Sequence, residues 1–147
     1  MTEAVTIHAP TFRSLKLQDW PEIDQRLMAA ALKAGGLRSP DGLASEWRPA
    51  TLEAVVHRNG TFLWWLSATG RLTPGSTPLE RVTMENVEAF IDAYGAAHAS
   101  NSVAAVVHGV YEATRVMCPG ADLSRLARVV KRLKRLAKPR PKLPRNG

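Results

Sequence analysis

Residues 51–70 read Thr-Leu-Glu-Ala-Val-Val-His-Arg-Asn-Gly-Thr-Phe-Leu-Trp-Trp-Leu-Ser-Ala-Thr-Gly, and this stretch decides whether the chain is all-helical. Asn59-Gly60 lies between two apolar pairs, which is a strong signal for a β-hairpin. One apolar face with helical spacing nevertheless continues through both halves, and Gly70 stands where a helix-ending glycine would. That face consists of Leu52, Val55, Val56, Asn59, Phe62, Leu63 and Leu66. We therefore predict one helix over residues 51–69, although an interior glycine costs about 1 kcal/mol relative to alanine.

Four further segments show helical spacing between residues that start and stop helices. They begin at Pro21, at Thr83, within Ser100-Asn101-Ser102 and at Asp122. Thr83 and Asp122 are suitable N-caps, and any residue of the run 100–102 can cap the helix that follows it. Gly35-Gly36 and Pro119-Gly120 end two of these helices, and the last runs to about Lys138. β-branched residues leave a strand as the alternative near Val103–Val110, but the spacing of three and four favours a helix.

The sequence therefore predicts an all-α fold, a compact bundle of about five short helices over residues 18–138. An irregular segment, 1–17, precedes it, and a Pro-rich basic tail, 139–147, follows. The chain has 147 residues, about one domain, with 45% hydrophobic and 22% charged residues. It contains no long apolar run, no secretion signal and one cysteine, so we expect a cytoplasmic protein without a disulfide, a structural metal or a cofactor.

The charge is concentrated at one end of the chain. Ten of the twenty Lys and Arg residues and none of the thirteen acids lie in residues 123–147. The first 122 residues then hold ten cations and thirteen acids, a formal charge of −3, beside a basic end of +10. Such asymmetry predicts a polyanionic partner, either nucleic acid or an anionic membrane surface, with a merely solvated tail as the alternative.

The last predicted helix separates apolar and basic residues onto two faces. Its apolar sector contains Leu126, Val129, Val130, Leu133, Leu136 and Ala137, with Leu123 at the edge, and its other side contains Arg125, Arg128, Lys131, Arg132, Lys134, Arg135 and Lys138. One face can pack on the bundle while the other contacts phosphates. The apolar sector has no Trp or Phe anchor, which disfavours binding to a membrane surface. A helix that only solvates its charges is the simplest alternative.

No enzyme motif is present. The sequence has no Walker A, G-x-G-x-x-G, G-x-S-x-G or H-E-x-x-H pattern, and its four histidines have neither acidic partners nor ligand spacing. His57 and His108 are better explained as partly buried polar groups or DNA-facing residues than as bases. The tryptophans at 47, 64 and 65 are expected in the core, and Cys118 is expected to be structural. Asp19, Glu22 and Asp24 are interpreted as partners of a helix dipole.

Several short motifs occur in the order found in one known family. They are Trp47-Arg48-Pro49-Ala50-Thr51-Leu52, Phe62-Leu63-Trp64-Trp65-Leu66, Gly70-Arg71-Leu72, Arg81-Val82-Thr83, Val87-Glu88-Ala89-Phe90-Ile91, Ala99-Ser100-Asn101-Ser102-Val103, residues 115–123 and the basic run from Lys131. This order resembles the N-terminal core-binding domain of tyrosine recombinases, the phage-type integrases. The resemblance covers roughly residues 20–145.

The resemblance implies a SAM-like helical domain that clamps recombination-site duplex DNA and contacts other integrase protomers. Two helices would face the major groove, the one beginning at Thr51 and the one beginning near Ser100. The residues carried over are Arg48, Thr51, His57 and Arg58 from the first helix and Ser100, Asn101 and Ser102 from the second. Together with the cations of the basic helix, they form the predicted DNA-binding set.

The sequence departs from the family's pattern in two ways. Glu53, Ala54, Val55 and Val56 stand where the family usually places basic and aromatic residues. The family's catalytic Arg, Lys, His, Arg and Tyr have no counterpart here, so we expect a DNA-binding module without catalysis. A protein–protein adaptor that has kept the fold but lost DNA contact is the alternative, and a membrane-surface protein is a third candidate.

Overall fold

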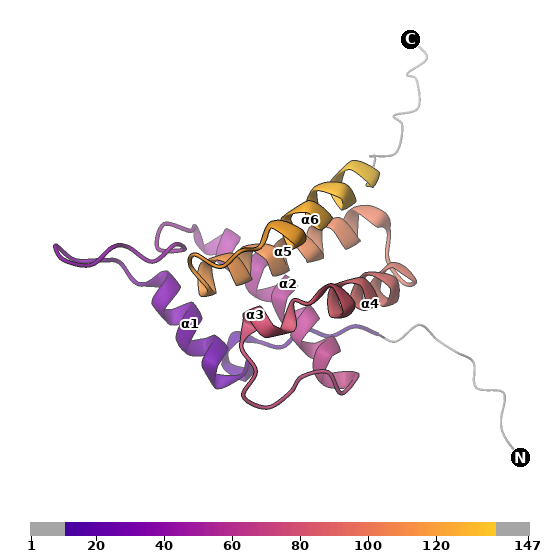
Figure 1. Ribbon diagram of the computed structural model, residues 1–147, viewed down its shortest axis with the longest axis horizontal. Helices are drawn as coiled ribbons and strands as arrows, with labels where there is room; N and C mark the ends of the chain where they lie inside the picture. The colour runs from indigo at the N-terminus through magenta and orange to yellow at the C-terminus, as the bar shows by residue number, and fades with distance from the viewer. Residues whose placement is uncertain (1–10, 138–147) are drawn as a thin grey trace, which may run out of the picture.

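The protein is described by a computed structural model that covers residues 11–137, shown in Figure 1. A short 3-10 helix, Leu17–Asp19, precedes six α-helices. These are α1 (Glu22–Leu32), α2 (Pro49–Ala68), α3 (Pro78–Arg81), α4 (Met84–Gly95), α5 (Ser100–Met117) and α6 (Ser124–Leu136). No strand occurs in residues 11–137 beyond an isolated bridge between Gly36 and Ser39, so the all-α prediction is confirmed.

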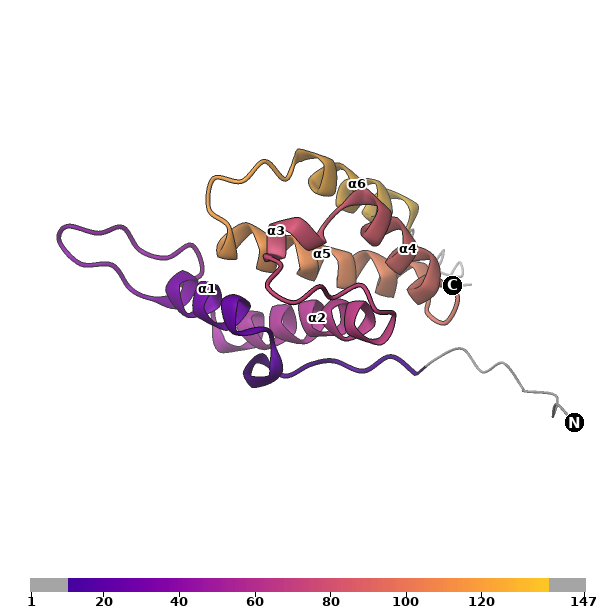
Figure 2. The ribbon, with the colours of Figure 1, turned by 60° about the horizontal axis from the view of Figure 1, so that its bottom comes forward.

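Helix α5 lies at the centre of the bundle. It packs against α1, α2, α3, α4 and α6, and its most extensive contact is with α2. In Figure 2 it lies between α2 on one side and α6 on the other. Its valines explain this position, because Val106, Val107, Val110 and Val116 are all buried on successive turns. The core therefore forms around α5, and the other helices cover it.

Helix α2 runs unbroken through Asn59-Gly60, which confirms the helix and excludes the hairpin. Glycine is needed at position 60 because of a tertiary contact and not because the chain turns there. A Cβ atom at position 60 would lie 2.3 Å from the carbonyl oxygen of Leu15, in the segment that crosses α2 before the first helix. The Leu15 N–H donates to the Gly60 carbonyl oxygen at 3.1 Å. Gly70 takes a φ of +71° after the helix end, as predicted.

The helix boundaries confirm some caps and correct others. The Thr83 side chain caps α4 by accepting a hydrogen bond from the Asn86 N–H at 3.1 Å, as predicted. The predicted caps of α5 were wrong, because Ala99 is the N-cap and residues 100–102 already belong to the first turn. The N-cap position of α6 is Leu123 rather than the predicted Asp122, but the Asp122 side chain does accept a hydrogen bond from the Ser124 N–H at 3.0 Å. Helix α6 ends at Leu136.

The short helix α3 was not predicted, and it brings the total to six helices rather than five. Its start is a capping box in which Thr77 and Glu80 exchange side-chain to backbone hydrogen bonds. Pro78 occupies the first helical position, where its missing N–H costs nothing. The helix places Arg81 against α1.

Arg81 forms a buried ion pair with Asp24, which corrects the interpretation of Asp24 as a dipole partner. The Arg81 Nη1 donates to Asp24 Oδ2 at 2.6 Å, and both residues are almost wholly excluded from solvent. Arg81 also donates to the side chain and the carbonyl oxygen of Ser76. Asp24 Oδ1 has no partner among residues 11–137. Burial raises the pKa of Asp24, and the Arg81 guanidinium opposes this rise.

The tryptophans contribute to packing, as predicted. Trp65 is buried, and Trp47 and Trp64 are partly buried against the same core cluster. Cys118 is half-buried against the same core cluster, and burial raises the pKa of its thiol.

Candidate nucleic-acid interface

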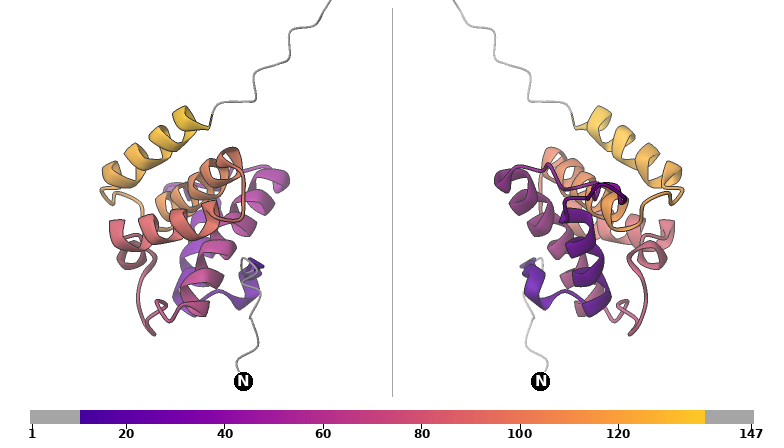
Figure 3. Two further views of the ribbon diagram at one scale, coloured as in Figure 1. Left: turned by 90° about the vertical axis from the view of Figure 1, so that its right-hand side faces the viewer. Right: turned by 90° about the vertical axis from the view of Figure 1, so that its left-hand side faces the viewer.

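Helix α6 lies along the outer edge of the bundle, as both views of Figure 3 show. Its buried side chains are Leu126 and Val130, which pack on α5. The apolar sector is narrower than predicted, because Val129 and Leu133 are only half-buried and Leu136 is 64% exposed. Burial of one narrow stripe leaves charged side chains and part of the apolar sector at the surface of the helix.

Six cations on α6 are exposed to solvent. They are Arg125, Arg128, Lys131, Arg132, Lys134 and Arg135. No residue between 11 and 137 forms a salt bridge with any of them, since the three salt bridges in that range all lie elsewhere. Cations three and four residues apart on one helix repel each other, so this arrangement gives the fold no electrostatic benefit.

A second group of polar residues lies where α2 crosses α5. The side chain of Arg58 passes over Gly109, so closely that a Cβ atom at position 109 would lie 2.4 Å from Arg58 Cβ. Beside this crossing is a hollow of about 380 Å³, lined by Thr51 and Arg58 of α2 and by His108 and Glu112 of α5. Gly109 is therefore what lets an arginine of α2 lie across α5.

The charge of Lys134, on α6, also acts on His108. Burial lowers the pKa of His108, and the charges of Lys134 and Arg58 lower it further, while Glu112 raises it. His108 Nε2 lies 3.4 Å from Glu112 Oε1. We call the surface formed by Thr51, Arg58, His108 and Lys134 the cationic junction.

Glu112 is the acid within the cationic junction. Arg115 Nη2 donates to Glu112 Oε2 at 2.7 Å, so this carboxylate is engaged by a cation of its own helix as well as by His108. The acid therefore pairs with Arg115 and lies beside the His108 imidazole, whereas Arg58 and Lys134 have no salt bridge among the described residues. A phosphate placed here would meet two free cations and one polarised imidazole.

The structure brings together only part of the predicted DNA-binding set. Arg48 and Thr51 are exposed at the start of α2, and Arg58 joins them along that helix. His57 lies in a different groove, beside the segment from Ser14 to Leu17, and its carbonyl oxygen accepts a hydrogen bond from the Ser14 hydroxyl at 2.6 Å.

The other predicted residues lie on α5 and α6. Ser100, Asn101 and Ser102 are exposed in the first turn of α5, where free backbone N–H groups favour anions. The α6 residues Arg128, Lys131, Arg132, Lys134 and Arg135 are all exposed, and Lys138 lies outside the described residues.

The sequence left His108 as either a partly buried polar group or a DNA-facing residue, and Glu112 and Arg115 were not predicted as its neighbours. The signal was present, because residues 108, 112 and 115 are spaced four and three apart and so share one helix face. The approach of Lys134 and Arg58 depends on how three helices pack, which no local pattern shows.

Two further observations concern other kinds of site. Within residues 11–137 no three His, Cys, Asp or Glu side chains are grouped so that they could hold a metal ion. No helix in that part of the chain combines the length and the apolar character that crossing a membrane requires.

Comparison with known proteins adds no relative. No protein-family model matches the sequence, and neither a curated protein nor a solved structure matches the chain. The resemblance to integrase core-binding domains stays a prediction from the sequence.

Proposed function

We propose that this chain is a DNA-binding module that contacts duplex DNA mainly through phosphates. The observation that carries the proposal is the set of six exposed α6 cations without an ion pair among the described residues. These charges do not stabilise the fold, but they would stabilise a complex with a polyanion. Condensed counterions are released from DNA as each phosphate is neutralised, and this release drives binding.

The cationic junction supports the same proposal. Arg58 of α2 and His108 of α5 line one hollow, and the charge of Lys134 on α6 acts on the His108 imidazole, so side chains of three helices contribute to this region. Arg58 can hold a phosphate with two parallel N–H donors, whereas Lys134 acts as a point charge. A DNA backbone that follows α6 and reaches the junction would contact both kinds of group.

We further propose a SAM-like core-binding domain of a tyrosine recombinase as the setting of this activity. The all-helical bundle and the order of the sequence motifs support this proposal. In that setting Thr51 and residues 100–102, all exposed, would contact the backbone or base edges. Glu53 is exposed on α2 and Glu112 lies in the junction, so we expect modest sequence preference.

The proposal is tested by fluorescence anisotropy with a labelled duplex at several salt concentrations. We expect dissociation constants of about 10⁻⁴ to 10⁻⁶ M at physiological salt, the range of non-specific binding. The logarithm of affinity should fall linearly with the logarithm of salt concentration. The double variant Lys131→Gln/Lys134→Gln should reduce the magnitude of that slope by about 2, since each phosphate contact contributes about 0.9.

The matched control is Arg26→Gln/Lys33→Gln, which removes two exposed cations at α1 and leaves α6 unchanged. It should bind like the unaltered protein. Binding that does not depend on salt, or an equal loss in the control, would contradict the proposal.

A further inference from the structure

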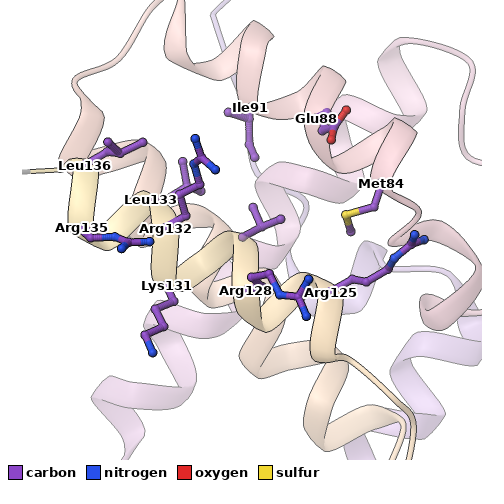
Figure 4. Close-up of a pocket in the computed structure, with 11 residues that line it drawn as sticks. Met84, Glu88, Ile91, Arg125, Arg128, Lys131, Arg132, Leu133, Arg135 and Leu136 are labelled. Atoms are coloured by element: carbon purple, nitrogen blue, oxygen red, sulfur yellow. The ribbon is translucent and has the colours of Figure 1, made fainter.

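A second groove lies on the other flank of α6, between α6 and α4 (Figure 4). Its volume is about 730 Å³. Apolar side chains from both helices line it, with Met84 and Ile91 on α4 and Val129, Leu133 and Leu136 on α6. We call it the α4–α6 groove. Lys134 does not line it, whereas the other five exposed α6 cations do.

The groove exists because α4 and α6 both pack on α5 rather than on each other. Val87 and Phe90 of α4 are buried in the core, as are Leu126 and Val130 of α6. Five further apolar residues line the space between the two helices, and they are Met84, Ile91, Val129, Leu133 and Leu136. Leu136 is the extreme case, since its side chain is 64% exposed.

The spacing of the apolar residues indicates which kind of ligand would fit the α4–α6 groove. Residues 84 and 91 on α4 are seven apart, and residues 129, 133 and 136 on α6 are four and three apart. Each set is one stripe along a helix. Residues 125 to 136 span about 16 Å at 1.5 Å per residue, roughly three helical turns. A third helix of about that length could pack its apolar face between the two stripes.

Charge selects the kind of helix. The rim of the α4–α6 groove carries Arg125, Arg128, Lys131, Arg132 and Arg135, and Glu88 is the one acid among its described lining residues. A bound helix with acidic flanks would neutralise this rim, and a basic helix would be repelled. The chain's own residues 138–147 contain four cations and no acid, so they are a poor match by charge. Duplex DNA could neutralise the rim with its phosphates, but it has no apolar face to cover the apolar residues of the groove.

We propose that the α4–α6 groove binds an amphipathic helix of a protein partner, with an apolar stripe on one face and Asp or Glu on its flanks. Five of the six exposed α6 cations belong both to this rim and to the proposed DNA-binding set, so DNA and a bound helix would compete for them. The proposal does not depend on DNA binding, because it rests on the apolar floor of the groove, which DNA does not use. It gives the predicted adaptor role a specific site and a specific partner chemistry.

The probe is a fluorescein-labelled peptide of about 16 residues with Leu at helical spacings of three and four, Glu on the flanks and Ala elsewhere. A scrambled peptide of the same composition serves as the reference. Anisotropy titration of the full chain should give at least about tenfold tighter binding for the patterned peptide, because only it presents a continuous apolar face. Equal binding of both peptides would overturn the proposal.

Two variants and one control locate the binding site. Leu136→Glu and Arg132→Glu should each weaken peptide binding at least about tenfold, by removing an apolar contact or reversing a rim charge. Lys134→Glu changes charge on the same helix outside the groove and should weaken peptide binding less than about threefold, while it weakens DNA binding. Positions 132, 134 and 136 are all exposed, so circular dichroism should be unchanged.

Other results would assign the groove differently and overturn the proposal. An equal loss of peptide affinity in Lys134→Glu would mean that the peptide binds through the overall positive charge of α6 and not in the groove. Duplex DNA could also displace the peptide. If Arg132→Glu and Lys134→Glu then weakened DNA binding equally, both flanks of α6 would form one DNA-binding surface. A dimer that Leu136→Glu dissociates would identify a second copy as the occupant. Loss of DNA binding alone, with patterned peptide bound as expected, would overturn only the proposed function.

Discussion

Arg81 and Arg132 place the same side chain in opposite environments. Arg81 is 4% exposed, and each of its three guanidinium nitrogens donates a hydrogen bond to Asp24 or Ser76. Arg132 is exposed on α6 and has no salt bridge with any residue from 11 to 137. Arg58, half-buried across Gly109, lies between these extremes.

The difference separates charges that hold the fold from charges that are left for a partner. A buried pair must stay intact, because removing one member leaves an uncompensated charge away from water. An exposed cation among other cations contributes nothing to folding and can be removed without harm. Substitutions in the three places should therefore have very different effects on stability and on binding.

The largest effect is expected at Arg81. Arg81→Met should lower the free energy of unfolding by about 3–5 kcal/mol, because the Asp24 carboxylate then loses its buried partner. Arg132→Met, the same substitution on α6, should change it by less than about 0.5 kcal/mol. Urea unfolding followed by circular dichroism measures both.

A double variant tests the physical reason for this difference. Asp24→Leu/Arg81→Met removes both charges, including the Asp24 oxygen that has no partner, and should recover most of the stability lost in the single variant. If the double variant is as unstable as Arg81→Met, then packing rather than charge determines the stability of the contact between Asp24 and Arg81.

A smaller effect is expected where Arg58 crosses Gly109. Gly109→Ala places a methyl group against Arg58 Cβ, close to the α2 backbone, so the two helices must separate. We expect a loss of about 1–3 kcal/mol, reduced by the better helix propensity of alanine. Gly95→Ala is the matched control, because its Cβ would meet only Val103, at an ordinary 3.7 Å. Thermal unfolding of both variants measures the difference, and equal melting temperatures would show that the crossing is loosely packed.

His108 should give a still smaller, pH-dependent effect. Burial and the charges of Lys134 and Arg58 lower the pKa of His108 below its value in the unfolded chain, about 6.5. The unfolded chain therefore binds the proton more readily, so stability is complete above about pH 6.5 and falls as pH is lowered through the window beneath it. His108→Gln should remove this component of the pH dependence. Urea unfolding at a series of pH values tests it, and identical profiles for the two proteins would contradict it.

The smallest effect is expected from the α6 cations themselves. Arg128→Gln/Lys131→Gln should raise the free energy of unfolding by a few tenths of a kcal/mol, about the repulsion of one or two like-charged pairs on a helix. The gain should disappear in about 1 M salt, where the screening length is about 3 Å. Chemical unfolding at low and high salt measures it, and a loss of stability would mean that these cations have partners in the fold.

The sequence predicts the helices well where one face repeats over many turns. The stripe through residues 51–69 predicted α2 correctly, although the reason for Gly60 depends on the distant Leu15. Helix α3 was missed because four residues show no periodicity, yet Thr77 and Glu80 formed a recognisable capping box. Asp24 and Arg81 are 57 residues apart, so their pairing has no local signal.

The candidate site was predicted in its composition but not in its arrangement. The cations of α6 could be read directly from the sequence, whereas their division between two flanks depends on where α4 and α5 lie. Leu136 looked like a core residue by spacing, but no helix covers that end of the stripe. His57 and Arg58 are neighbours in sequence, but His57 lines only the groove beside Ser14–Leu17, whereas Arg58 lines both that groove and the hollow at α5. The rotation of about 100° per residue along a helix explains the difference.

The central position of α5 also determines how the molecule opens. Five helices rest on α5, so its amide protons can exchange with solvent only when most of the bundle has come apart. Helix α6 packs chiefly on this one neighbour through Leu126 and Val130, and its detachment disturbs little else. The amides of α6 should therefore exchange through a local opening that leaves the other helices folded.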